Sequence, residues 1–257
     1  MSRLLRNGVL VCLIVMIILA LCSSGTAHAQ PVQVPQFELR FGGGEDDPES
    51  LVGFLQLLLI MALLTLAPAF VVLMTSFTRI VVVLSFARNA MATQQIPPNQ
   101  ILIGLALFLT YFVMQPTFAR VNETAIQPYL EGEITQEEAF ALGEAPLREF
   151  MFYHTREKDL ALFVDIAGMQ APETRDDIPL HVLVPSFVIS ELKTAFQMGF
   201  MLFVPFLIID MVIASTLMSM GMFMLPPVIV SMPFKILLFI LVDGWHLLVK
   251  SLLESFI

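Results

Sequence analysis

The feature that most constrains this chain is a run of twenty-eight residues without a charged side chain, from Leu51 to Thr78. A transmembrane helix needs about 20 apolar residues, so this run, which continues beyond Arg79 to Ala87, exceeds one crossing. Pro68 lies inside the run, and a proline kinks or breaks a helix because it lacks an N–H and clashes with the preceding turn. We therefore predict one long kinked helix or two helices separated by a break.

Three more apolar blocks follow along the chain. Residues 101–119 carry no charge, and residues 192–225 and 228–257 carry very few. The chain is 57% hydrophobic and only 14% charged, which places it outside the ordinary soluble class. The pattern predicts an all-α membrane protein with two long hydrophobic helical hairpins, at residues 51–119 and 186–257.

The region between the hairpins, residues 120–185, has a different composition, with thirteen acidic residues against five basic ones. Stretches such as ITQEEAFALGEAPLREFMF are typical of water-exposed helices. Arg79 and Arg88 lie toward the tip of the first predicted hairpin. Basic residues mark cytoplasmic loops, and the short loop around Arg88 is the candidate cytoplasmic turn of this hairpin. We therefore predict that residues 120–185 form an acidic helical region outside the cytoplasm.

The first 29 residues have the layout of a cleaved secretory signal peptide. An uncleaved transmembrane helix is the alternative, but the apolar stretch of thirteen residues rises only about 20 Å, short of a hydrocarbon core of about 30 Å. The pattern consists of a basic start at Arg3 and Arg6, an apolar stretch at residues 9–21, and a cleavage site framed by Ala27 and Ala29.

Residues 30–50 combine prolines, a triple glycine and five acidic residues, a composition that buries too little apolar surface to order itself. We predict a flexible acidic N-terminal strap. Cleavage before it would remove both cysteines, Cys12 and Cys22, and with them any disulfide or thiolate chemistry. The four histidines lack the spacing of a helix-borne metal site, and the sequence predicts no cofactor.

Five charged residues lie inside or beside the apolar helices of the second hairpin: Glu191, Lys193, Asp210, Lys235 and Asp243. Charges in apolar helices are costly and face protein or water. Lys235 and Asp243 are eight residues apart, which places them on roughly one helix face, where each could meet a partner on the other hairpin. The available partners are Glu191, Lys193 and Asp210. We predict buried charge pairs that fix assembly register. The alternative is that Asp210 or Glu191 takes part in ion coupling.

Three stretches are more specific than hydropathy: PSFVISELKTAFQMGF at residues 185–200, PFKILLFILVDGW at 233–245, and APAFVVLMTSFTRIVVVLSFARNAM at 67–91. They resemble the FliP family, the P subunit of the flagellar type III protein export gate, whose injectisome relatives are called SctR. The resemblance runs from about Leu51 to the C-terminus. It implies a conical, right-handed helical gate of five P, four Q and one R subunits. It also implies that the hydrophobic segments lie largely inside that assembly, whereas hydropathy alone predicts lipid-spanning helices.

The stretch MSMGMFMLPP, residues 218–227, places methionines at a predicted helix break. Methionine is flexible and polarizable, so it fills irregular gaps that change shape. The resemblance implies that this turn is a gasket closing the export channel. The family commonly has three methionines at the gasket positions, and Phe223 departs from that pattern. The alternative is ordinary core filling. The gasket residues are Met222, Phe223 and Met224, and the residues that permit a loop are Gly221, Pro226 and Pro227.

The function implied by the resemblance is that of a pore-forming core subunit, without enzymatic activity, that passes unfolded flagellar proteins across the bacterial inner membrane. Its implied partners are Q-like and R-like subunits, copies of itself, the large export-gate subunit and B-like subunits, within the flagellar basal body and with the middle region in the periplasm. No nucleic-acid partner is predicted. The alternative is an ion-coupled small-solute transporter or channel, motivated by Asp210, Glu191 and the proline-broken helices. An intramembrane hydrolase is disfavoured because no glycine-framed serine stands out.

Overall fold

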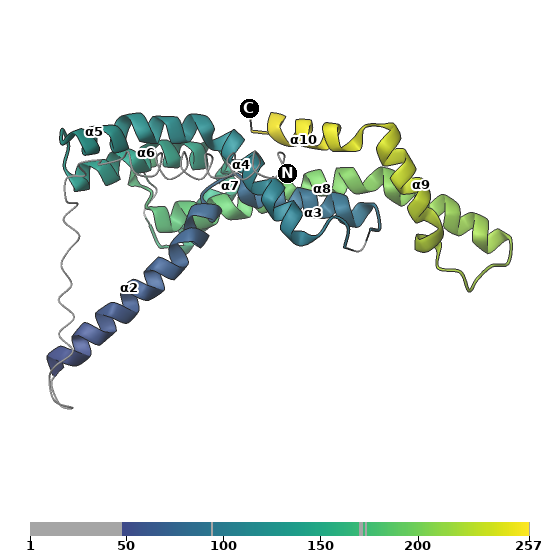
Figure 1. Cartoon of the computed structure of the whole chain (residues 1–257), viewed down its shortest axis with the longest axis horizontal. Coiled ribbons are helices and arrows are strands. Elements are labelled where there is room, and N and C mark those ends of the chain that lie inside the picture. Colours follow the sequence, from purple (N-terminus) through teal and green to yellow (C-terminus); the bar gives the residue numbers. More distant parts are fainter. Residues whose placement is uncertain (1–47, 94, 170–171, 173, 257) are drawn as a thin grey trace, which may run out of the picture. The chain divides into compact units, whose positions relative to one another are not determined.

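The computed structural model describes residues 48–256, apart from residues 94, 170–171 and 173 (Figure 1). It consists of two compact units, Met1–Met61 and Ala62–Ile257, and the first is described only from residue 48. The predicted signal peptide, with its cleavage site at Ala27 and Ala29, lies outside the described residues, as does most of the predicted strap. The last residues of that strap, 48–50, are already helical and begin helix α2 (Pro48–Leu73).

The second unit is built from helices, and the described residues contain no strand, so the all-α prediction is confirmed. After α2 the order along the chain is α3 (Phe77–Ala90), α4 (Asn99–Val121), the π-helix η1 (Asn122–Ile126), α5 (Gln127–Glu131), α6 (Gln136–His154), α7 (Glu157–Ile166), the 3₁₀-helix η2 (Arg175–Asp177), α8 (Leu180–Ser219), α9 (Pro227–Leu241) and α10 (Gly244–Glu254).

The first apolar run is divided into α2 and α3, as one of the two expected forms requires, but the break is not at the proline. Pro68 lies within α2, and the helix ends at Leu73. The side chain of Thr75 donates a hydrogen bond of 2.9 Å to the carbonyl of Val72, which satisfies one of the carbonyls that a helix end leaves open. The break therefore follows from Thr75, whose polar side chain reaches back to the backbone.

Within the first predicted hairpin, α3 and α4 pack together and against α8 and α10. Arg88 lies at the tip, where its Nη1 donates to Asn99 Oδ1 at 2.6 Å and to the Pro97 carbonyl at 3.3 Å. The buried side chains of this core are all apolar and come from four helices, so their burial holds those helices together. They are Ile80, Val83, Leu84, Ala87, Leu102, Ala106, Ala195, Leu248 and Leu252.

Helices α3 and α8 approach closely at Gly199. A Cβ built on Gly199 would lie 2.5 Å from Cγ of Phe86 and 3.1 Å from its Cβ, so a relaxed side chain alone cannot make room for it. The Phe86 ring in turn contacts Phe196 and Phe203 edge to face, with ring centroids 5.2 and 6.0 Å apart. Glycine is therefore required here by the space between two helices.

Replacing Gly199 by alanine is expected to lower the free energy of unfolding by about 1–3 kcal/mol, because an added methyl group overpacks this contact. The measurement is thermal unfolding of the purified protein in detergent. Gly104→Ala is the matched control, because Gly104 lies inside α4 with nothing within 4 Å of an added Cβ. Alanine there gains up to about 1 kcal/mol of helix propensity. Equal melting temperatures for both variants would show that Phe86 and α3 move to accommodate the added methyl group without loss of stability.

The acidic middle region has well-defined helix ends. Helix α5 stops at Gly132, which has a φ of 76°, and α6 starts with a capping box in which Thr135 and Glu138 satisfy each other's backbone N–H groups. Helices α6 and α7 pack on the first turns of α8 through a second apolar core. Because α8 begins at Leu180, it includes the last residues of the predicted middle region and continues into the predicted second hairpin.

Two continuous helical stretches in the described part of the chain are long and apolar enough to cross a membrane: Asn99–Glu131, of 33 residues, and Leu180–Ser219, of 40 residues. Helices α9 and α10 form a third candidate if taken together, but they meet at a bend of 65°. The bend is at Asp243, whose φ of 52° is left-handed and rare for a residue with a side chain. The last apolar block is therefore two helices at an angle.

Candidate functional site

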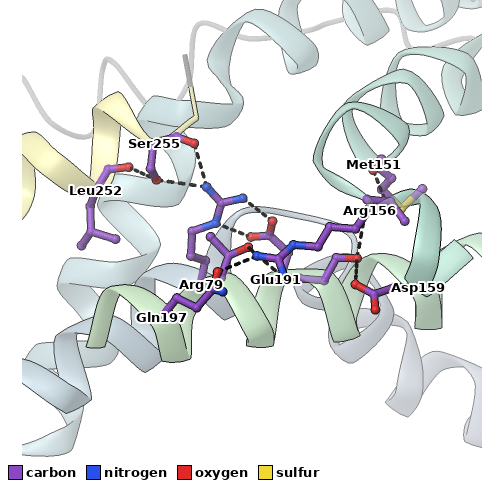
Figure 2. Close-up of polar contacts among 11 residues, drawn as sticks. Arg79, Met151, Arg156, Asp159, Glu191, Gln197, Leu252 and Ser255 are labelled. Carbon is purple, nitrogen blue, oxygen red and sulfur yellow. Dashed lines mark hydrogen bonds and ion pairs between the residues drawn. The ribbon is translucent and has the colours of Figure 1, made fainter. Parts of the chain in front are cut away.

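The most deeply buried charged group joins α3 to α8. Arg79 of α3 and Glu191 of α8 are both buried and form a two-pronged ion pair (Figure 2). Arg79 Nε donates to Glu191 Oε2 at 2.9 Å, and Arg79 Nη2 donates to Oε1 of the same carboxylate. Such paired, charge-assisted hydrogen bonds fix orientation as well as distance. The contact sets the rotation of α3 against α8.

The same guanidinium also holds the end of the chain. Arg79 Nη1 donates to the carbonyl of Ser255 at 2.8 Å and to its hydroxyl at 3.0 Å, and the Arg79 Cζ atom lies 3.8 Å from the centre of the Phe256 ring. A cation over an aromatic face is attracted by the ring's electrons. Every nitrogen of this guanidinium thus has a partner, and α3, α8 and the residues after α10 meet at one point.

His154, at the end of α6, completes the wall of this site. Its ring lies 4.7 Å from that of Phe150, 5.0 Å from Tyr153 and 5.3 Å from Phe256, measured between ring centres. Burial and, as the smaller cause, the positive charge of Arg79 lower the pKa of His154 to about 4. The imidazole is therefore neutral near pH 7, and the site carries no second positive charge beside the arginine.

A second ion pair joins α8 to α9. Lys235 Nζ lies 2.6 Å from Asp210 Oδ2, and the Ser231 hydroxyl donates to Asp210 Oδ1 at 2.5 Å. Ser231 and Lys235 are one helical turn apart on α9, so both reach the same carboxylate. Lys235 is buried, whereas the Asp210 side chain is 28% exposed. The structure thus brings together two of the five charges that sequence analysis singled out.

The other members of that set are placed differently from the expectation. Lys193 and Asp243 are exposed, and neither forms an ion pair with any residue that the structure describes. Their pairing across subunits stays a prediction. Lys235 and Asp243 do not share a helix face, because α9 ends at Leu241. Glu191 is paired, but with Arg79, which sequence analysis had placed at the hairpin tip. The signal that could have identified Arg79 is its isolation in an apolar run.

The methionine-rich turn connects α8 to α9. Gly221 has a φ of 77°, and the N–H groups of Gly221 and Met222 bond back to the last turn of α8 at 3.0 and 2.9 Å, which is how a glycine ends a helix. Pro226 and Pro227 start α9. Phe223 is 77% exposed and Met224 is 97% exposed, while Met222 is half-buried. The turn therefore presents large apolar side chains away from this chain's own core.

Beyond the turn, an extensive apolar surface of α8 and α9 is uncovered. Monomeric soluble proteins rarely expose contiguous patches of this kind, and such surfaces mark contacts with lipid or other subunits. The exposed residues include Phe196, Phe200, Met201, Leu207, Ile208, Met211 and Val212 on α8, and Ile229, Phe234, Leu237, Ile240 and Leu241 on α9. Among the described residues no three His, Cys, Asp or Glu side chains gather as a metal site.

Comparison with known proteins finds relatives of similar sequence. The flagellar biosynthetic protein FliP of Bacillus subtilis (strain 168) is 61% identical over 210 residues, which cover 82% of this chain and 95% of the relative. The protein of that name from Aquifex aeolicus (strain VF5) is 47% identical over 226 residues, covering 87% and 92%. The one from Pectobacterium carotovorum subsp. carotovorum is 53% identical over 201 residues, 78% of each chain.

A family model also matches the residues that form the site. The FliP family model matches residues 60–252, a range that includes both ion pairs and the methionine-rich turn. It reaches from α2 almost to the end of α10. This extent, together with relatives that match along nearly their whole length, shows that the chain belongs to the FliP family.

Proposed function

We propose that this chain is a pore-forming core subunit of the flagellar type III protein export gate and that it passes unfolded flagellar proteins across the inner membrane. Its relatives are named flagellar biosynthetic protein FliP, which supports a place in the flagellar export apparatus. Two helices long enough to cross a membrane, and a third bent candidate, support a membrane location. We further propose that the chain is not an enzyme and that energy comes from other components.

The observation that carries the proposal is the methionine-rich turn. A turn at the end of two apolar helices that exposes Phe223 and Met224 has no covering partner among the described residues of its own chain. Several copies brought together would place these side chains beside one another. Flexible thioethers and one aromatic ring can then close a narrow opening and repack when a polypeptide passes. We propose Met222, Phe223 and Met224 as this gasket.

The exposed apolar faces of α8 and α9 support an assembly of several subunits. The partners that we propose are copies of this chain with Q-like and R-like subunits, in the ratio of five to four to one, together with the large export-gate and B-like subunits. We propose that helices α5 to α7 face the periplasm, because the short basic loop around Arg88 marks the cytoplasmic turn of the first hairpin. Signal-peptide cleavage before residue 30 fits the same orientation.

An ion-coupled transporter fits the structure less well. Such a function needs a carboxylate that gains and loses an ion during the cycle. Glu191 is held by two arginine nitrogens, and Asp210 is held by Lys235 and Ser231. Both carboxylates named for that alternative therefore have stable partners within the chain.

The test replaces Met222, Phe223 and Met224 together by glycine in cells that make the complete gate. Loss of three apolar side chains from the seal is expected to raise the leak of ions and small dyes across the inner membrane several-fold. Fluorescence of an external dye entering the cells measures this leak. Export of flagellar proteins into the medium is followed in the same culture.

The matched control replaces the same three residues by leucine, which keeps the turn apolar and is expected to keep the leak near its normal level. Copurification of the Q-like and R-like subunits shows whether each variant assembles. Assembled glycine variants that neither leak nor alter export would contradict the gasket and leave the methionines as filling for an irregular turn.

A further inference from the structure

The end of α8 and the whole of α9 form a hairpin that carries the methionine-rich turn (Figure 1). At the base of this hairpin, Phe206 and Phe239 pack with Ala90 and Met91 at the end of α3. Within the described part of the chain, the apolar cores include none of residues 207–238. Beyond its base, the hairpin therefore lacks a packed core that would fix it to the other helices.

The helices from which the hairpin projects are fixed at both of its ends. Before the base, α8 is held by the pair between Glu191 and Arg79 and by the close contact of α3 at Gly199. After the base, α10 is held by Leu248 and Leu252, which lie in the first apolar core. The hairpin thus leaves a rigid body through α8 and returns to it through α10.

The hairpin is also tied together internally. Lys235 and Ser231 of α9 both bind the carboxylate of Asp210 on α8. Pro233 lies inside α9, but it stands between the two residues that hold this carboxylate, so the ion pair braces that part of the helix. The end of α8 and α9 can therefore move as one piece.

Each of the two connections to the body has a weak point. Pro205 lies inside α8, and because proline has no N–H, the carbonyl of Met201 lacks its helical hydrogen bond. Asp243 joins α9 to α10 with a φ of 52° and a ψ of 52°, a left-handed conformation, and the two helices meet there at 65°. Residues held in such rarely populated conformations are typical of parts that switch between states.

The two weak points lie at the same level of the hairpin. Phe206 of α8 lies beside Phe239 of α9, with ring centres 6.4 Å apart. Because the two helices run in opposite directions, Pro205 lies opposite the residue that follows Phe239. Asp243 comes three residues later, which is a rise of about 4.5 Å and less than one helical turn. Bending at both points therefore turns the hairpin about a single axis.

A hollow lies beside this axis. Its volume is about 640 Å³, and α3, α8, α9 and α10 all contribute to its wall. Pro205 and Phe206 line it on one side, and Val242 and Gly244, which flank the bend, line it on another. In a close-packed interior a bend would displace neighbouring side chains. Here the hollow provides room for the base of the hairpin to move.

We propose that Pro205 and Asp243 are the two hinges of the gate, at which the hairpin bends as one piece and carries the gasket away from the channel axis. This inference rests on the gasket function proposed above and names how the gasket opens. Hinges are commonly a few residues at or near element ends that absorb changes of φ and ψ. From Pro205 to Ser219 the helix rises about 21 Å, so a bend of about 10° moves the turn by about 4 Å.

The first test replaces Pro205 by alanine, which supplies the missing N–H and stiffens α8. Cells that make the complete gate are expected to export flagellar proteins several-fold more slowly, without an increased leak of ions or dyes. Pro185→Ala is the matched control, because Pro185 lies in the same helix but next to side chains buried in the second apolar core, such as Phe187. Its export is expected to equal that of the unchanged protein.

The second test measures the motion in the purified full-length protein in detergent. Spin labels are attached to Thr216→Cys on the hairpin and Lys250→Cys on α10, with the two native cysteines replaced by serine. Pulsed electron paramagnetic resonance is expected to show a distance distribution several ångströms wider than that for labels at Phe108 and Lys250, which both lie outside the hairpin. Pro205→Ala is expected to narrow the first distribution and leave the second unchanged.

Three results would overturn the hinges. They are a hairpin distribution as narrow as the control distribution, normal export by Pro205→Ala, and a leak in Pro205→Ala, which would show that the proline sets the closed position. Because the distances are measured on the isolated chain, they decide the matter even where the Pro205→Ala gate fails to assemble. A leak in the glycine gasket variant without hairpin motion would reject the hinges and keep the gasket. Hairpin motion without that leak would instead contradict the proposed function.

Discussion

Replacing Arg79 by leucine is expected to lower the free energy of unfolding by about 3–5 kcal/mol, because it leaves the buried carboxylate of Glu191 without its partner. The same change removes the donors to Ser255 and the cation over Phe256, so the end of α10 loses its attachment as well. Thermal unfolding in detergent is expected to show a melting temperature lower by roughly 10 °C. The accumulated amount of the protein in cells is expected to fall with it.

Two comparisons make this result specific to the buried pair. The double variant Arg79→Leu with Glu191→Leu is expected to recover much of the loss, since an apolar pair replaces a buried ion pair at little cost. Arg120→Leu breaks an ion pair with Glu149 whose side chains are 55% and 63% exposed, and it is expected to leave the melting temperature nearly unchanged. A loss for Arg79→Leu as small as that for Arg120→Leu would contradict the assigned role.

Breaking the pair between α8 and α9 is expected to have the second-largest effect. Lys235→Met removes a buried ammonium and leaves Asp210 with the Ser231 hydroxyl as its hydrogen-bond donor. Because Asp210 is partly exposed, water replaces some of the lost interaction, and we expect a loss of about 2 kcal/mol. The measurement is again thermal unfolding, accompanied by copurification of the Q-like and R-like subunits, since this hairpin carries the methionine-rich turn.

A charge exchange tests the pair directly. Lys235→Asp and Asp210→Lys each place two like charges together and are expected to be more harmful than Lys235→Met. Combined, they restore opposite charges, and the Ser231 hydroxyl can accept a hydrogen bond from the new lysine, so partial recovery is expected. A combined variant no better than the worse single variant would show that the two residues act independently.

Sequence reasoning named Lys235 and Asp210 among the candidates for charge pairing because each residue is a charge in an apolar helix, and such charges require partners. It also found the helical class and the turn between α8 and α9, because uncharged runs and a Gly and Pro-Pro combination are local signals. These features depend on short stretches of sequence. They are therefore visible before any tertiary contact is known.

The partner of Glu191 depends on tertiary contacts, and sequence reasoning missed it. Sequence analysis placed Arg79 toward the hairpin tip, whereas the break before α3 puts Arg79 near the start of that helix, facing α8. The break at Asp243 had a local signal that was not used. An Asp-Gly pair is a common turn former, and Gly244 is also needed there because a Cβ would lie 2.4 Å from the Phe239 ring.

The attachment of Ser255 to Arg79 also has a consequence for the order of events during synthesis. The two residues are 176 positions apart, and Glu191 is 112 positions after the arginine. At about 5–20 residues per second, the ribosome adds the carboxylate roughly 6–22 s after Arg79 and the serine roughly 9–35 s after it. The guanidinium is thus translated long before its ligands and must be kept hydrated or sheltered while the nascent chain grows. The C-terminal contact is the last of the three to become available, so the set of contacts around Arg79 is completed only after α10 has been made.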